Sequence, residues 1–119
     1  MAKVSEKSTV EKIEELALNL GYTATTEPSK IRGHRFKPDI LVKHGRKFVV
    51  VEVKSRPPML YDILQVSEYR KQGHAGSILC VPDDAFDRIP NSVRLYADQT
   101  GIHLCKLAQV GAKLKSMLD

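Results

Sequence analysis

The stretch Phe48–Lys54, with the sequence FVVVEVK, places the strongest constraint on the fold. Side chains of a strand alternate between the two faces of a sheet, so the consecutive valines Val49–Val51 need apolar cover on both faces. Strands buried on both faces are typical of sheets that lie between two layers of helices. The same alternation puts Glu52 and Lys54 on one face. We therefore expect a central strand over 48–54, covered by helices on each side.

Apolar periodicity, turn residues and prolines divide the rest of the chain into further elements. The first helix is expected to have Ser8 as its N-cap, Glu11 as the partner in a capping box, and Gly21 just past its end. Pro90 prevents a long helix across the polar turn 83–90, which leaves room for one helical turn. We expect helices over 9–20, 58–72, 92–99 and 108–118, strands over 22–26, 38–42, 48–54, 77–81 and 102–107, and a loop over 27–37.

The order of these elements, α-β-β-β-α-β-α-β-α, predicts an α/β fold with a mixed sheet flanked by helices on both faces. Pro38 stands at the first position of its strand, where proline is tolerated. Asn91 or Ser92 is expected to cap the helix that follows Pro90. The 119 residues contain no repeat or linker and match the size of one domain, so we expect a single domain over 1–119.

Composition excludes several classes of protein. Hydrophobic residues make up 42% of the chain and charged residues 28%, which is typical of a globular protein. No apolar run reaches the length of about 18 residues that a membrane span needs, and the N-terminus lacks an apolar signal core. Cys80 and Cys105 lie in apolar strand-like runs, so we expect buried free thiols in a cytoplasmic, reducing environment. No cluster of cysteines suggests zinc, and the spacing of the histidines forms no metal-binding pair.

The net charge of +5 is concentrated in one third of the chain. Residues 30–56 carry nine basic and two acidic side chains, a balance of +7, whereas 1–29 have a balance of −2 and 57–119 of zero. This block is either a solvated basic face or a surface that attracts a polyanion with phosphates. The basic side chains of the 27–37 loop, on the second interpretation, face nucleic acid: these are Lys30, Arg32, Arg35 and Lys37.

The two acids of the basic block form a candidate metal site. Asp39 and Glu52 are joined through a polar turn at 44–47, and a hairpin at this turn brings Asp39 beside Glu52 and Lys54. Carboxylate and carbonyl oxygens are the ligands that Mg²⁺ prefers, and the carbonyl of Val53 would supply a third one. A bound cation would relieve the repulsion between the two carboxylates. An ammonium group beside them would orient water or neutralise charge on a phosphodiester.

Pro38-Asp39 followed by Glu52-Val53-Lys54 resembles the PD-(D/E)xK nuclease superfamily, and the resemblance extends from the first helix to the final strand. Within that superfamily the chain is most similar to the small archaeal Holliday-junction resolvases. The resemblance implies a restriction-endonuclease-like fold and a Mg²⁺-dependent DNA endonuclease in which Mn²⁺ substitutes. It also implies DNA as the partner, a homodimer, and no membrane or organic cofactor. Asp39 and Glu52 would then bind the metal, and Lys54 would handle water and charge.

The same resemblance assigns a metal-binding carboxylate to the first helix. In the resolvases this glutamate lies near the start of the helix, well before a Gly-aromatic step that is Gly21-Tyr22 here. Glu11, ten residues before Gly21, fits this position best. Glu14 is the alternative, because helix geometry places it nearer the apolar stripe.

Two further motifs follow the Glu-x-Lys sequence. Gln65 and Tyr69 match the Q-x-x-x-Y pattern of many superfamily members, which implies that Gln65 assists at the active site and that Tyr69 braces it or touches DNA. The alternatives are a surface position for Gln65 and a position at the edge of the core for Tyr69. Ser55-Arg56 matches a dipeptide frequent in the resolvases, and Arg56 would contact phosphate.

A second function class remains open at this level, namely a nucleic-acid-binding or assembly subunit that keeps the fold without turnover. Carboxylates that face phosphate argue against it, because a protein that only binds gains nothing from them. Junction resolution would need two sites in a symmetric dimer. The segment 59–61 or the terminal helix would provide its interface. Restriction-type cleavage would need base-reading loops, for which 119 residues leave little room.

Overall fold

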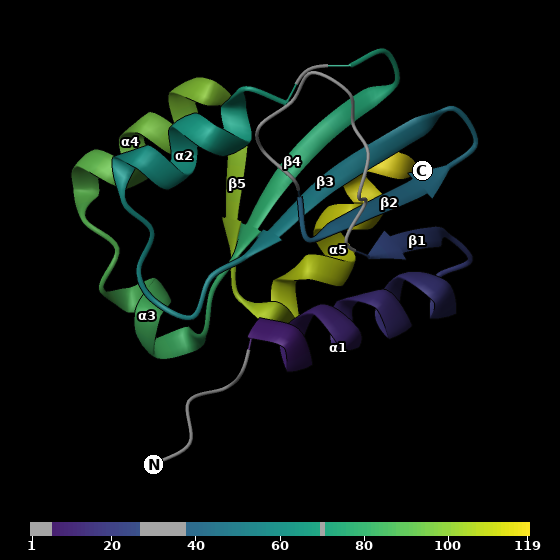
Figure 1. The fold of residues 1–119 in the computed structure, drawn as a ribbon, viewed down its shortest axis with the longest axis horizontal. Coiled ribbons are helices and arrows are strands. Elements are labelled where there is room, and N and C mark those ends of the chain that lie inside the picture. Colours follow the sequence, from purple (N-terminus) through teal and green to yellow (C-terminus); the bar gives the residue numbers. More distant parts are fainter. Residues whose placement is uncertain (1–5, 27–37, 70) are drawn as a thin grey trace.

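The computed structural model describes residues 6–26, 38–69 and 71–119 (Figure 1). The element order is α-β-β-β-α-β-α-α-β-α, so the expected α/β class is confirmed and one short helix, α3, is added to the expected order. The helices are α1 (Glu6–Asn19), α2 (Leu60–Ser67), α3 (Asp83–Asp87), α4 (Asn91–Thr100) and α5 (Leu107–Leu118). The strands are β1 (Thr23–Thr26), β2 (Ile40–His44), β3 (Lys47–Val53), β4 (His74–Cys80) and β5 (Ile102–Cys105).

The described strands form one mixed sheet in the order β1-β2-β3-β4-β5. The pairs β1–β2 and β2–β3 are antiparallel, whereas β3–β4 and β4–β5 are parallel. The β2–β3 hairpin turns through Gly45, whose φ of +62° suits a tight two-residue turn. Its register pairs Ile40 with Val51, so the next residues outward, Asp39 and Glu52, meet where the hairpin opens.

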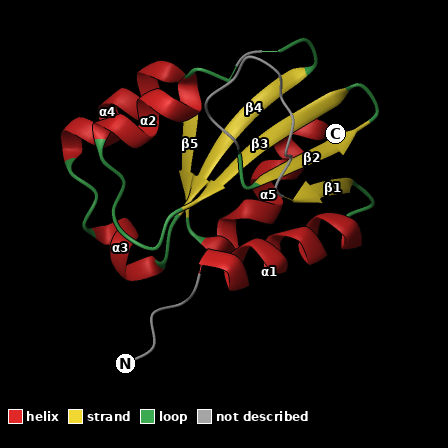
Figure 2. Cartoon of the chain, viewed as in Figure 1, coloured by secondary structure: helices red, strands yellow, loops and turns green. Residues whose placement is uncertain are grey.

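Helices cover both faces of the sheet, as the valine run predicts. Val49 and Val51 pack with Leu114 in a cluster between the sheet and helices α1 and α5. Val50 packs with Ile63 in a second cluster, beneath α2 and α4. Figure 2 shows α2 and α4 lying side by side, away from α1 and α5. Burial of each such valine contributes about 1.5–3 kcal/mol relative to exposure, so β3 anchors both halves of the core.

The predicted helix caps and the predicted place of Pro38 differ from the structure. Helix α1 already includes Glu6, so Ser8 lies within the helix and the predicted Ser8 cap is wrong. In this first turn of α1, Glu6 accepts a hydrogen bond from the Ser55 amide, just beyond β3. Pro38 lies two residues before β2 and not at its first position. Helix α4 begins at Asn91 with Pro90 as its N-cap and no side-chain cap bond, so the predicted cap at Asn91 or Ser92 is also wrong.

Helix α2 ends at Ser67, five residues before the predicted boundary at 72. The reason is tertiary, because Tyr69 leaves the helix to pack its ring edge-on against Phe48, with ring centroids 5.7 Å apart. The chain then returns to the sheet through Gly73, whose carbonyl accepts a hydrogen bond from the Phe48 amide. Strand β4 consequently begins at His74, three residues earlier than predicted.

Gly73 makes this return possible, and we expect its replacement to be costly. Its φ is +92°, and a Cβ atom there would lie 2.4 Å from the backbone oxygen of Arg46. Gly45 is a matched control, because its φ is also positive but a Cβ would meet nothing within 4 Å. Gly73→Ala should lower the free energy of unfolding by about 2–4 kcal/mol and Gly45→Ala by about 1 kcal/mol. Urea denaturation measures both, and equal losses would contradict the close-approach argument.

The cysteines and the apolar segments agree with the sequence interpretation. Cys80 and Cys105 are buried free thiols on adjacent strands, and burial raises the pKa of Cys80 to about 12. Neither thiol is therefore a nucleophile at neutral pH. Within the described residues no helix has the length and apolar character that a membrane span requires.

Candidate active site

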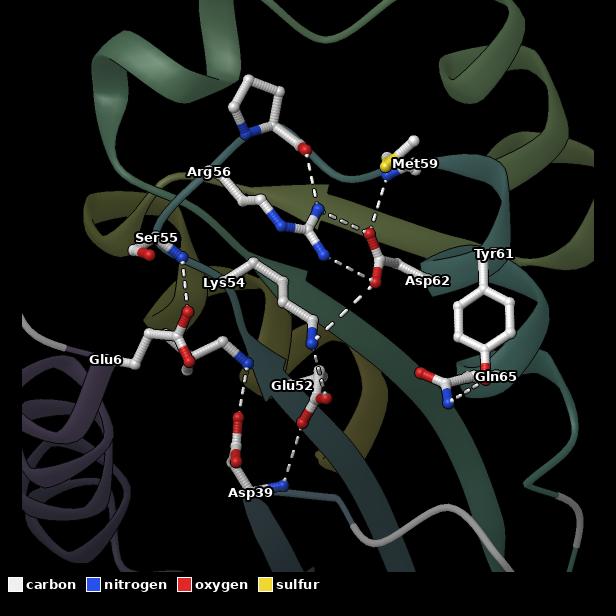
Figure 3. Close-up of polar contacts among 12 residues, drawn as sticks. Glu6, Asp39, Glu52, Lys54, Ser55, Arg56, Met59, Tyr61, Asp62 and Gln65 are labelled. Atoms are coloured by element: carbon white, nitrogen blue, oxygen red, sulfur yellow. Dashed lines mark hydrogen bonds and ion pairs between the residues drawn. The ribbon is translucent and has the colours of Figure 1, made fainter.

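The residues of the Pro-Asp and Glu-x-Lys motifs converge at the open end of the β2–β3 hairpin (Figure 3). Asp39 immediately precedes β2, Glu52 is the next-to-last residue of β3, and Lys54 directly follows that strand. Because β3 and β4 are parallel, their carboxyl ends lie at this same edge. In α/β sheets, the region beyond the carboxyl ends of parallel strands is the usual place for a ligand.

Asp39 and Glu52 are held together through backbone amides. The Val53 amide donates a hydrogen bond to Oδ2 of Asp39 at 2.8 Å, and the Asp39 amide donates to Oε1 of Glu52 at 3.2 Å. In a continued β2–β3 ladder the Val53 amide would donate to residue 38, so the Asp39 carboxylate replaces a backbone partner. Because the N–H and C=O of one strand residue point the same way, the Val53 carbonyl also faces the side where Asp39 lies.

Glu52 is buried in this arrangement, with 7% of its surface exposed. Burial and the adjacent Asp39 carboxyl together raise its pKa to about 8, because the ammonium of Lys54 only partly offsets these two effects. A raised pKa at a carboxyl pair is typical of a place where positive charge is lacking. The site therefore fits a divalent cation, which would favour the ionised form of Glu52.

The donor set suits a hard cation. The carboxylates of Asp39 and Glu52 and the carbonyl of Val53 are all oxygen ligands, and Mg²⁺ is commonly held by one or two carboxylates together with water and substrate phosphate. No group of three or more histidine, cysteine, aspartate or glutamate side chains is arranged to hold a metal in the described ranges. Water and substrate would therefore have to complete the coordination.

Lys54 lies between two acids. Its Nζ is 3.6 Å from Oε2 of Glu52 and 3.9 Å from Oδ1 of Asp62, and its side chain is 22% exposed. The sequence predicts the first contact, because Glu52 and Lys54 share a face of the strand. It does not predict the second. The ammonium is thus held at the rim of the candidate metal site with one face open to solvent.

Asp62 is the main residue that the sequence interpretation misses. It is the third residue of α2, is 3% exposed, and accepts hydrogen bonds from the Met59 amide at 2.8 Å and from Arg56 Nη1 at 2.9 Å. Burial alone would raise its pKa, but the hydrogen bonds from Arg56 and Met59 and the charges of Arg56 and Lys54 lower it overall. An acid at the third helical position is a recognised capping signal, and this signal could have indicated Asp62.

Three carboxylates of α1 lie near the site. Glu11 and Glu14 line a cavity of about 280 Å³ together with Asp39, so the structure leaves both as candidates for the helix carboxylate. Glu6 also lines this cavity, and its Oε2 accepts a hydrogen bond from the Ser55 amide at 2.9 Å. Glu6 therefore joins α1 to the chain just beyond β3. No spacing in the sequence indicates this contact, which spans 49 positions.

The two residues of the Q-x-x-x-Y pattern have different surroundings. Gln65 is half-buried on α2, one turn after Asp62, and donates a hydrogen bond to the Tyr61 hydroxyl at 3.0 Å. Tyr69 is 2% exposed within the core beneath α2. The structure therefore corrects the prediction that Tyr69 contacts DNA and supports the alternative of a core position. Its ring braces Phe48, at the opposite end of β3 from Glu52.

Of the residues predicted to contact phosphate, only Arg56 belongs to the described part of the chain. Lys30, Arg32, Arg35 and Lys37 lie outside the described residues. Arg56 is described and has a half-exposed side chain, but its guanidinium is paired with Asp62. Its two nitrogens face the two oxygens of Asp62, at 2.9 and 3.3 Å. Arg56 thus has a structural partner in addition to its predicted role toward phosphate.

Comparison with known proteins shows a similarity of fold and no more. No family model and no curated protein matches the sequence. The solved structure of AF1548, a protein of unknown function, is similar with a TM-score of 0.65 and 14% identity, covering 90% of this chain and 64% of that one. Protein VC1899 from Vibrio cholerae is similar with a TM-score of 0.58 and 14% identity, covering 93% and 31%. This chain thus spans less than two thirds of either protein.

Proposed function

We propose that this protein is a Mg²⁺-dependent DNA endonuclease with a restriction-endonuclease-like fold. The observation that carries the proposal is the convergence of Asp39, Glu52 and Lys54 at one sheet edge, linked by the hydrogen bonds and ion pair described above. Two carboxylates and a carbonyl can hold a metal ion, and an ammonium beside them can offset the charge that develops during phosphodiester hydrolysis. The resemblance of the sequence to the PD-(D/E)xK motif implies the same activity.

Each side chain has a defined task in this proposal. Asp39, Glu52 and the carbonyl of Val53 would hold Mg²⁺ together with water, and Glu11 or Glu14 would act from α1 through a water ligand of the ion, across the cavity that they line with Asp39. The bound cation would polarise a phosphoryl oxygen and lower the pKa of a water ligand. Lys54 would orient the attacking water and offset charge that develops on the phosphate. Gln65 would assist from α2, the helix that also carries Asp62, the second acid beside Lys54.

DNA is the proposed substrate because the carboxylates lie within the basic block 30–56, which has a balance of +7. Cleavage of a branched DNA at both strands of a junction would need two active sites in a symmetric dimer. Large apolar side chains exposed on and just before α2 and on α4 support such an interface: Met59, Leu60, Tyr61, Leu64 and Leu95. Sedimentation measurements with and without junction DNA test this part of the proposal separately.

Cleavage assays test the proposed activity. Purified protein is incubated with Mg²⁺ and a four-way junction, its linear arms, and single-stranded DNA. Cleavage of at least one substrate is expected, with loss of about 10²-fold or more in Asp39→Asn. Asp98→Asn, which removes an exposed carboxylate from α4, is the matched control and should cut at the wild-type rate. Failure to cut any substrate, or equal cutting by wild type and Asp39→Asn, would rule the proposal out.

Calorimetric titration with Mg²⁺ or Mn²⁺ separates this proposal from a subunit that only binds nucleic acid. The nuclease requires a measurable binding event, alone or with DNA, that disappears in Asp39→Asn. A protein that binds DNA but takes up no metal under either condition would instead be a binding subunit.

A further inference from the structure

We propose that Asp62 is a positioning residue that keeps Lys54 in the active site when a metal ion occupies Glu52. The inference rests on the proposed function, because it concerns the same site and the same reaction. It adds a residue that lies outside the PD-(D/E)xK motif and comes from a different element, helix α2.

Lys54 and a bound metal ion would compete for Glu52. The ammonium of Lys54 lies 3.6 Å from Oε2 of Glu52, the carboxylate that the proposal also gives to the metal. A divalent cation bound there would neutralise the carboxylate and repel the ammonium. The contact that Lys54 makes with its own strand would therefore weaken when the site becomes competent.

Asp62 offers Lys54 an alternative partner. Its Oδ1 lies 3.9 Å from the same Nζ, so Lys54 can shift from one acid to the other without leaving the site. Figure 3 shows Lys54 reaching between Glu52 and Asp62, with Asp62 on the side away from Asp39. The acid that would receive Lys54 is therefore not one that the proposed metal site uses.

Asp62 is itself held in place. Its side chain is 4% exposed, and its carboxylate accepts hydrogen bonds from the Met59 amide and from both terminal nitrogens of Arg56. A bidentate arginine and a helix N-terminus hold a carboxylate in one orientation and keep it ionised. Arg56 thus balances the charge of Asp62, and Asp62 in turn has a defined place for the ammonium of Lys54.

The experiment observes the ammonium of Lys54 directly by ¹H–¹⁵N NMR, since a lysine ammonium held by a carboxylate exchanges slowly enough to give a signal. Lys54→Arg identifies the signal by its absence. In the wild type the signal should persist when Mg²⁺ is added. In Asp62→Asn it should be absent in the presence of Mg²⁺. Loss of the wild-type signal on Mg²⁺ addition, or survival of the Asp62→Asn signal in the presence of Mg²⁺, would overturn the inference.

A second arm needs no metal, so failure of the proposed function can be told apart from failure of this inference. Glu52→Gln removes the negative charge from Glu52, as metal binding would. The Lys54 signal should remain in Glu52→Gln, where Asp62 is still ionised, and disappear in Glu52→Gln/Asp62→Asn. Survival of the signal in the double variant would overturn the inference even if no Mg²⁺ binds to the wild type.

Activity supplies a third readout. Asp62→Asn should reduce kcat by about tenfold while Mg²⁺ affinity stays within threefold of wild type, because no proposed metal ligand changes. Arg56→Gln keeps the Asp62 carboxylate and should keep the Lys54 signal in the presence of Mg²⁺. If Arg56→Gln removes that signal as fully as Asp62→Asn does, the carboxylate of Asp62 is not what positions Lys54. The wild-type titration needs only Lys54→Arg for assignment of the signal, and loss of that signal with Mg²⁺ would overturn the inference even if Asp62→Asn did not fold.

Discussion

Glu52→Gln is expected to abolish Mg²⁺ binding and lower DNA cleavage by about 10³-fold or more, and at the same time to make the metal-free protein more stable at pH 8. The loss of activity follows from removal of a proposed metal ligand. The gain in stability follows from burial, because an ionised carboxyl at 7% exposure is costly without a cation. A neutral amide of the same shape can still accept the hydrogen bond from the Asp39 amide.

The pH dependence of stability gives this prediction its sign. Burial and the adjacent Asp39 carboxyl raise the pKa of Glu52 from 4.5 to about 8 in the folded protein. Between these two values the unfolded chain releases a proton that the folded chain keeps, so the contribution of Glu52 to stability is complete below about pH 4.5 and is lost as the pH rises to 8. Wild type should therefore lose stability over this range, and Glu52→Gln should lack that loss.

Urea denaturation in the presence of a chelator measures the effect. At pH 8 Glu52→Gln should exceed wild type by roughly 1–3 kcal/mol in the free energy of unfolding, and the gap should close toward pH 5. Added Mg²⁺ should stabilise wild type but not the variant. Glu15→Gln, which neutralises an exposed carboxylate of α1, is the control and should show neither effect. A variant less stable than wild type at pH 8 without metal would contradict the assignment of Glu52 as a buried carboxyl whose ionised form needs a cation.

The parts of this site that the sequence predicts are those fixed by strand geometry. The alternation of β3 puts Glu52 and Lys54 on one face, and the tight turn at Gly45 returns Asp39 to them. Likewise the run Val49–Val51 predicts cover on both faces, which α1 and α5 on one side and α2 and α4 on the other provide. Periods of two residues and turn chemistry are local properties, so a sequence carries them directly.

The parts that the sequence does not predict depend on contacts between elements. The Glu6–Ser55 bond joins α1 to the end of β3 and extends the helix past the apparent capping box at Ser8. Tyr69 packs on Phe48 and α2 ends early at Ser67, although the sequence pattern predicts a helix to residue 72. Asp62 reaches Arg56 across a proline pair, where no regular spacing applies. Tertiary packing decides each of these cases against the local pattern.

Lys54→Gln is expected to slow DNA cleavage without weakening Mg²⁺ binding. Removal of an ammonium 3.6 Å from Oε2 of Glu52 removes a competitor for that carboxylate, so Mg²⁺ affinity should stay the same or rise by up to about tenfold. Cleavage should nevertheless fall by about 10²–10³-fold, because no group remains to orient the attacking water or offset the developing charge. Calorimetry and single-turnover cleavage measure the two quantities on the same protein.

The opposite signs distinguish a catalytic Lys54 from one that only stabilises the fold. A structural lysine would lose metal affinity and activity together, because the carboxylates would lose their alignment. Lys71→Gln provides the matched control, since this exposed lysine precedes β4 on the same chain and should change neither quantity. Tighter metal binding with slower cleavage is the result that a water-orienting Lys54, held between Glu52 and Asp62, requires. Weaker metal binding with unchanged cleavage would remove Lys54 from the reaction.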